Sequence, residues 1–201
     1  LGTFTAIAST VEYDDSTANR SVANVSYDHL EIDCGTRTVS TSGSLTIAGD
    51  LTVTSGTFAA GSNTVTVTGA TDVNGTLTIS TGTVDANGPF DATGGSVTFS
   101  GAGRLQLGDA VTSLGTFTPS TGTVEFDDQI SDQTVPILSY QNLEIDKGTR
   151  TATNAGALVV PGTLTMTSGT LDVSGTINMT GGATTFGSGR RLATIRFGMS
   201  S

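Results

Sequence analysis

The chain has 201 residues, 35% of them hydrophobic, and 18 acidic against 8 basic side chains give it a net charge of −10. So acidic a surface repels phosphate backbones and anionic lipid, which argues against binding to nucleic acid or to a membrane surface. Tryptophan is absent, 27 residues are glycine, and threonine and serine are abundant. This composition favours short strands and tight turns over helices.

The second half of the chain repeats the first. VEYDD at Val11 returns as VEFDD at Val124, and many shorter phrases return at the same offset. Such self-similarity predicts an internal duplication, with 1–113 as the first repeat copy and 114–201 as the second. The second copy is shorter by two thirteen-residue units, and a stack in which each rung contacts only its neighbours tolerates such a loss.

Within each copy the glycines mark a shorter period, and apolar residues alternate with polar ones between them, as in strands with one buried face. Six glycines are spaced thirteen positions apart: Gly43, Gly56, Gly69, Gly82, Gly95 and Gly108. The alternation predicts these inward pairs: Leu45/Ile47, Leu51/Val53, Phe58/Ala60, Thr71/Val73, Leu77/Ile79, Val84/Ala86, Phe90/Ala92 and Val97/Phe99. The polar residues between them are predicted to point outward.

Two inward side chains cannot stabilise a strand by themselves, so stacking must supply the rest of the free energy. We therefore predict an all-β fold, a parallel β-solenoid (β-helix) built from short strands punctuated by glycine. Its coil is either a two-strand turn of about thirteen residues or a three-strand turn of about twenty, and the alternating glycines favour the shorter coil. The alternative is a pair of tandem β-sandwich domains.

The first third of each copy fits the glycine grid less well. Val11–Asp33 and Val124–Asp146 each hold recognisable strands around a polar stretch. We predict that each forms a loop or wider rung that protrudes from the stack and is available for contacts.

Acidic clusters in these regions are the candidate metal ligands: Glu12, Asp14 and Asp15 in the first copy, and Glu125, Asp127 and Asp128 in the second. Clustered carboxylates can coordinate Ca²⁺. Their spacing matches no EF-hand or glycine-rich calcium repeat, however, and a solvated turn also explains an Asp-Asp pair. We therefore expect no cofactor, with Ca²⁺ at these residues as the alternative.

Catalytic chemistry is not expected. The single histidine, His29, and the single cysteine, Cys34, are replaced in the second copy by Asn142 and Lys147, so no triad or zinc cluster can be built. Arg37 and Arg150 recur beside acidic residues and are predicted to form salt bridges across rungs.

Threonine-rich phrases such as TLTIS at Thr76 raise the possibility of ice binding by a flat threonine array. On the thirteen-residue grid, however, aspartate and alanine interrupt the outward column, which argues against it. That column reads Thr46, Ala59, Asp72, Asp85 and Thr98.

The phrases GTFTPSTGTVEFDD, YQNLEID, GTRT and GTLTMTSGTLDVSGT resemble the β-strand repeats of very large bacterial surface proteins, similar in style to filamentous-haemagglutinin-type adhesins. The resemblance covers nearly the whole chain except its arginine-rich end. It implies an extracellular stalk or adhesin segment with a β-helical shaft, and it carries no catalytic residues to this chain.

Together these observations predict a non-enzymatic structural or adhesive segment of a secreted bacterial cell-surface protein. The expected partners are other copies or neighbouring repeats of the same protein, and surface glycans or cell-surface receptors. The alternatives are a self-assembling extracellular filament subunit, whose strand edges join chain to chain, and a carbohydrate-binding or carbohydrate-cleaving β-helix.

Overall fold

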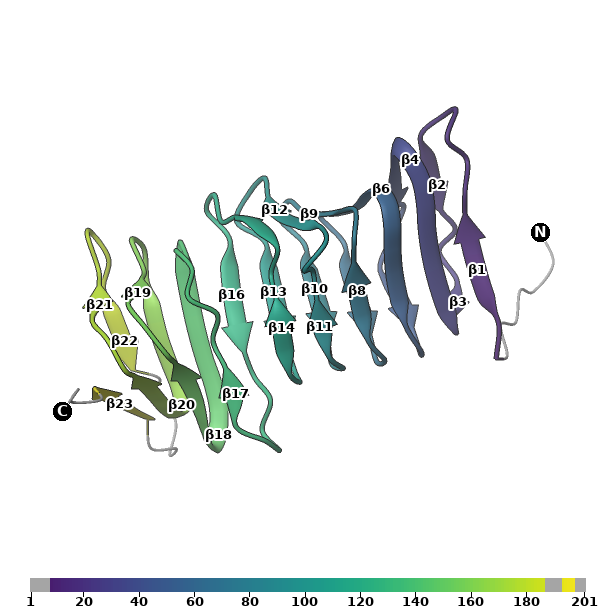
Figure 1. The fold of residues 1–201 in the computed structure, drawn as a ribbon. Helices are drawn as coiled ribbons and strands as arrows, with labels where there is room; N and C mark the ends of the chain where they lie inside the picture. The colour runs from purple at the N-terminus through teal and green to yellow at the C-terminus, as the bar shows by residue number, and fades with distance from the viewer. Residues whose placement is uncertain (1–7, 187–192, 198–201) are drawn as a thin grey trace.

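The computed structural model describes residues 8–186 and 193–197, and this part of the chain consists of strands joined by turns and bends. The strands stack along one axis, from β1 at one end to β21, β22 and β23 at the other (Figure 1). Neighbouring strands pair in parallel throughout, as in β7 with β10 and β10 with β13. The predicted all-β parallel β-solenoid is therefore confirmed, and the sandwich alternative is wrong because its sheets would be antiparallel. No helix in the described part is long and apolar enough to cross a membrane.

Each coil places its strands on three faces in turn. Face 1 holds β1 (Thr10–Tyr13), the first parts of β4 (His29–Thr41) and β6 (Leu51–Gly61), β8 (Thr71–Val73), β11 (Phe90–Asp91), β14 (Val111–Ser113), β17 (Gln133–Thr134), the last parts of β18 (Asn142–Asn154) and β20 (Leu164–Val173), and β23 (Ala193–Phe197). Face 2 holds β2 (Arg20–Val22), the last parts of β4 and β6, β9 (Thr76–Ile79), β12 (Ser96–Phe99), β15 (Thr116–Thr118), β19 (Leu158–Val159) and β21 (Ile177–Asn178). Face 3 holds β3 (Ser26–Tyr27), β5 (Leu45–Ile47), β7 (Thr64–Val67), β10 (Thr83–Ala86), β13 (Arg104–Leu107), β16 (Thr123–Phe126), the first parts of β18 and β20, and β22 (Thr184–Phe186).

The length of a coil corrects the preference for the shorter, two-strand turn. Thr64 pairs with Thr83, and Thr83 pairs in turn with Arg104, so the chain returns to the same face only after three strands. Thirteen residues, the spacing of the glycines, cover two strands and their two turns. A closed coil requires three strands and three turns. Large buried rings on different faces, such as Phe58 and Phe90, fit the wider interior of a three-sided coil.

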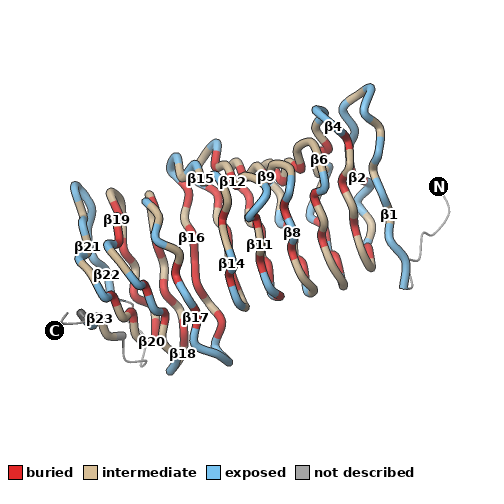
Figure 2. The backbone as a smooth tube through the Cα atoms, in the orientation of Figure 1, coloured by how far each residue is buried: buried red, intermediate tan, exposed pale blue. Residues whose placement is uncertain are grey.

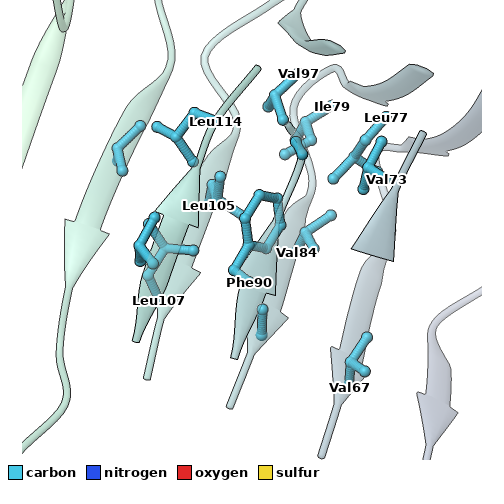
Figure 3. Close-up of a cluster of buried hydrophobic side chains, with 14 of the residues drawn as sticks. Val67, Val73, Leu77, Ile79, Val84, Phe90, Val97, Leu105, Leu107 and Leu114 are labelled. Carbon is cyan, nitrogen blue, oxygen red and sulfur yellow. The ribbon is translucent and has the colours of Figure 1, made fainter. Parts of the chain in front are cut away.

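The interior is one continuous apolar core. Buried positions alternate with intermediate or exposed ones along the strands (Figure 2). Side chains such as Val84, Phe90 and Leu105 converge between the faces (Figure 3). All of the predicted inward pairs, Thr71 included, are buried. The sequence alternation therefore identified the core correctly even though the coil length was misjudged.

The two sequence copies are rotated relative to each other by one face. β1, in the first copy, lies on face 1, whereas its counterpart β16 lies on face 3. From Val11 to Val124 the chain makes five full coils and then advances by two further faces, so the offset between the copies is not a whole number of coils. The structural unit is thus the single strand with its turn, and one core cluster runs through both copies.

The predicted protruding loops are not formed. Thr123 pairs with Asn142, so the coil that begins with β16 is as long as the one that runs from Thr64 to Thr83. Thr10 pairs with His29 at the same spacing in the first copy. The polar stretches that broke the glycine pattern are turns at the corners of ordinary coils.

Candidate functional site

The acidic residues of the first copy lie at the edge of the stack. Glu12 and Asp14 are exposed. Asp15 accepts hydrogen bonds from the backbone N–H and hydroxyl of Thr17, and it pairs with Arg20. These hydrogen bonds, led by that of the Thr17 hydroxyl, hold the pKa of Asp15 well below its usual value. Asp15 therefore stabilises a turn.

Asp128, the counterpart of Asp15, also stabilises a turn but is only 5% exposed. Its Oδ1 accepts hydrogen bonds from the backbone N–H groups of Ile130 (2.8 Å) and Ser131 (3.0 Å). Its Oδ2 lies 3.9 Å from the Nζ of Lys147. In the second copy, the carboxylate that stabilises the turn therefore also lies close to the buried amine of Lys147.

Glu125 lies on the outer side of face 3 and is held by a basic clamp. The guanidinium of Arg104 donates to Glu125 at 2.6 Å and to Glu144, one coil further on, at 2.7 Å. Gln106 donates a second hydrogen bond to Glu125 at 2.8 Å. Arg104 therefore ties three successive coils together and offsets part of the negative charge of this face.

Asp127 is the least satisfied of these carboxylates. Its Oδ1 is buried and has no hydrogen-bond partner among the described residues. Burial, with Glu125 and Asp85 nearby, raises the pKa of Asp127 to about 6. Asp127 consequently takes up a proton at a higher pH than an unperturbed aspartate does.

Three of the six candidate calcium ligands are already engaged by other groups of the protein. The two clusters lie on strands of different faces, more than five coils apart, and Asp15, Glu125 and Asp128 already accept hydrogen bonds from protein groups. In residues 8–186 and 193–197 no group of three or more His, Cys, Asp or Glu side chains is placed to hold a metal ion. Asp15 and Asp128 stabilise turns, and Glu125 takes part in the ladder between coils.

The predicted salt bridges of Arg37 and Arg150 are not formed within the described ranges. Arg37 donates instead to the backbone carbonyl of Ser16 at 3.3 Å. The acidic residues beside these arginines bond to hydroxyls of the next coil, because stacking places a Thr-Ser pair above them. The bonds are Thr54 to Glu31, Ser55 to Asp33, Thr167 to Glu144 and Ser168 to Asp146.

The most unusual chemistry in the described part surrounds Lys147, which sequence reasoning did not single out. Its side chain is fully buried, and Nζ donates to the Ser131 carbonyl and to Oε1 of Gln133, both at 3.0 Å. Burial lowers the pKa of the Lys147 amine, while Asp128 and other nearby aspartates act in the opposite direction. A lysine, a glutamine and an aspartate thus share one pocket beside face 1.

Comparison of the two copies supplies a signal that could have found this pocket. Asp15 and Asp128 correspond, but Arg20 is replaced by Gln133 and the buried Cys34 by Lys147. In the first copy the cation is the half-exposed Arg20 at the surface, whereas in the second it has moved inside. The loss of the cation at Arg20 is compensated by the gain of a cation at Lys147. Such a paired change indicates that the positions of Gln133 and Lys147 are in contact.

Face 2 carries a grid of hydroxyl groups that no aspartate interrupts, although Ala59 still lies in one of its columns. The five residues of the thirteen-residue column lie on three different faces and form no column. The true outward columns follow the pairing register. One contains Thr38, Thr57, Thr76, Ser96 and Thr116, and the other Ser40, Ala59, Thr78, Thr98 and Thr118.

This grid is uncharged, unlike the outward columns on the other two faces. Face 3 carries Asp85, Gln106, Glu125 and Glu144 in one column, and face 1 carries Glu12, Glu31, Asp72 and Asp91. An open groove of about 590 Å³ runs along the corner beside face 2, lined by glycine, serine, threonine and asparagine, among them Gly56, Gly75 and Gly95. The two outward columns of face 2 are thus free of charged side chains, whereas those of the other two faces are acidic.

Comparisons with known proteins leave the family open. The chain matches no protein-family model, no curated protein and no solved structure. The β-solenoid fold is therefore established by the structure itself.

Proposed function

We propose that the chain is a non-enzymatic structural segment of a secreted bacterial cell-surface protein, in which the solenoid acts as a stiff shaft. The observation that carries this proposal is the ladder of face 3, where nine described strands pair without a break from β3 to β22. Each coil adds about 4.8 Å, so eight steps give a rod about 40 Å long. Longer arrays of the same unit would extend the rod in proportion.

Adhesive contacts are proposed for the coil that begins with β16. Ile130 is 81% exposed and Ile137 is 58% exposed. The corresponding first-copy residues are Thr17 and Asn24, so the apolar side chains are particular to the second copy. Exposed apolar side chains of this size are suited to contact with another macromolecule.

The location of the chain on intact cells tests the shaft proposal. Antibodies raised against the purified chain should label the surface of unpermeabilised producing cells, because a shaft must project from the cell. An antibody against an intracellular protein serves as the control and should label only permeabilised cells. Labelling by both antibodies only after permeabilisation would contradict the proposal.

Ice binding is a second candidate function, favoured by the hydroxyl grid of face 2. Strand spacing sets one period of the grid at about 4.8 Å, and alternate residues along an extended strand set the other at about 6.6 Å. A regular array of hydroxyl groups can donate hydrogen bonds to, and accept them from, an ordered layer of water. Threonine adds a methyl group beside each hydroxyl, and β-branching restricts its rotamers, so the array is ordered before it meets ice.

Disruption of the grid tests ice binding. We expect the chain to shape ice crystals and to lower their growth temperature in a freezing-point osmometer. Thr78→Tyr should abolish both effects, because the tyrosine ring would project from the centre of face 2. Thr66→Tyr is the matched control, since Thr66 lies on the outer side of face 3 between Thr46 and Asp85, and it should leave both effects intact. Unshaped ice with the native chain would exclude this function.

A further inference from the structure

The pocket around Lys147 brings together three groups that can react with one another. Lys147 is fully buried, Gln133 is 3% exposed and Asp128 is 5% exposed. The Lys147 Nζ lies 3.0 Å from the amide oxygen of Gln133 and 3.9 Å from Oδ2 of Asp128. A nucleophile, an amide and a proton acceptor are therefore held together away from bulk water.

We propose that Lys147 and Gln133 become joined by an intramolecular amide bond, which makes this pocket a self-modification site. The Nζ of Lys147 attacks Cδ of Gln133, the new Cδ–Nζ bond forms, and the Cδ–Nε2 bond breaks. One proton passes from Nζ to Nε2 through the carboxylate of Asp128, and ammonia leaves. No oxidant or cofactor is needed, because the step exchanges one amide for another.

The Gln133 amide is held by hydrogen bonds at both of its ends. Its Nε2 donates hydrogen bonds to the backbone carbonyls of Leu107 at 2.9 Å and Asp109 at 2.5 Å. These bonds bridge the position on face 1 where described strand pairing stops at β14 and resumes at β17. Because both ends of the amide are held, its carbonyl stays directed at Lys147, and such fixed proximity is a large part of the rate of an intramolecular reaction.

Asp128 is likewise oriented toward the amine. Two backbone N–H groups hold its Oδ1, so Oδ2 remains on the side of Lys147. A carboxylate in this position can take a proton from the attacking nitrogen and return it to the departing one. Burial also favours the neutral amine, which is the nucleophilic form.

The first copy provides an internal comparison. Its corresponding residues are Asp15, Arg20 and Cys34, so the carboxylate is retained while both reacting partners are missing. The amine and the amide occur together only in the second copy. The coupled replacement is what a reacting pair requires, since either group alone would have no partner.

The bond would connect β17 on one coil to the corner of β18 on the next. It would act where the ladder of face 1 is interrupted, and so would prevent the coils from separating under load. This inference goes beyond the proposed shaft, because the modification is a property of the pocket and is measured on the isolated chain.

Intact mass spectrometry of the denatured full chain tests the proposal. The expected mass is lower than the sequence mass by one ammonia. Trypsin should fail to cut after Lys147 and should release Leu105–Arg150 as one peptide, and chymotryptic cleavage after Tyr140 should leave its two parts connected through the new bond. The full sequence mass, with trypsin cleavage after Lys147, would overturn the proposal.

Three variants localise the reaction, with folding of each checked by circular dichroism. Gln133→Leu and Asp128→Asn should both give the full sequence mass of the variant. Asp128→Asn should do so even though the reacting amine and amide are both still present. Gln106→Leu, on the outer side of face 3, should keep the loss of ammonia. A loss that maps instead to Asn74–Gly75 or Asn87–Gly88, where a backbone succinimide can form, would also overturn the proposal.

Discussion

Gly115→Ala should lower the free energy of unfolding by about 2 to 5 kcal/mol, from backbone strain and overpacking combined. Gly115 has a φ of +62°, and it forms the corner before β15. A Cβ there would lie 2.3 Å from the backbone oxygens of Ala92 and Gly95 in the preceding coil. Neither oxygen can rotate away, so the two coils would have to separate. Urea unfolding followed by circular dichroism measures the change.

Gly61→Ala is the matched control for this prediction. Gly61 has nearly the same φ, +61°, but a Cβ at this position meets no atom within 4 Å. Its substitution should therefore cost only the backbone strain, about 1 to 2 kcal/mol. If Gly61→Ala destabilised the chain as much as Gly115→Ala, close stacking of the coils would not be the reason for glycine at the corner.

Phe58→Ala should lower the free energy of unfolding by about 3 to 5 kcal/mol, because it leaves a cavity in the core. Phe58 is fully buried on face 2, where its neighbours in the adjacent coils are Val39 and Leu77. The described coils share a single core cluster, so adjacent coils cannot compensate by separate packing. The shift in the urea midpoint at an unchanged slope measures the effect.

Phe186→Ala is the control that separates burial from residue type. Phe186 lies on β22 and is 58% exposed, so its substitution should change the free energy of unfolding by no more than about 0.5 kcal/mol. Equal effects of the two substitutions would mean that the core of the described coils is not what stabilises the chain.

The sequence by itself determined which side chains are inside. Strict alternation places Leu45 and Ile47 on the inner side of one strand and Thr46 on the outer side, and this holds whatever the coil length, because successive side chains of a strand point to opposite faces. The duplication was equally readable, and strands in the second copy begin where the offset from Val11 to Val124 predicts them, as β16 and β18 do.

Only the tertiary structure decided how many strands close a coil. A glycine at every thirteenth position is compatible with a coil of two steps and with a coil of three, since local spacing defines the step but not the closure. Closure depends on the interior volume and on pairing between distant positions, such as Thr64 with Thr83. Thr78 and Thr98 pair in adjacent coils and share one column of face 2. A thirteen-residue coil does not place them in one column, so the hydroxyl grid could not be seen from the predicted coil length.

The pocket of Lys147 was hidden for the same physical reason. Asp128 precedes Lys147 by 19 residues, the length of one three-strand coil, so these two side chains meet because the chain returns after three strands rather than two. Alternation along a strand is local and can be read from the sequence. Neighbours across coils depend on where the chain closes, and that is fixed by packing of the whole core.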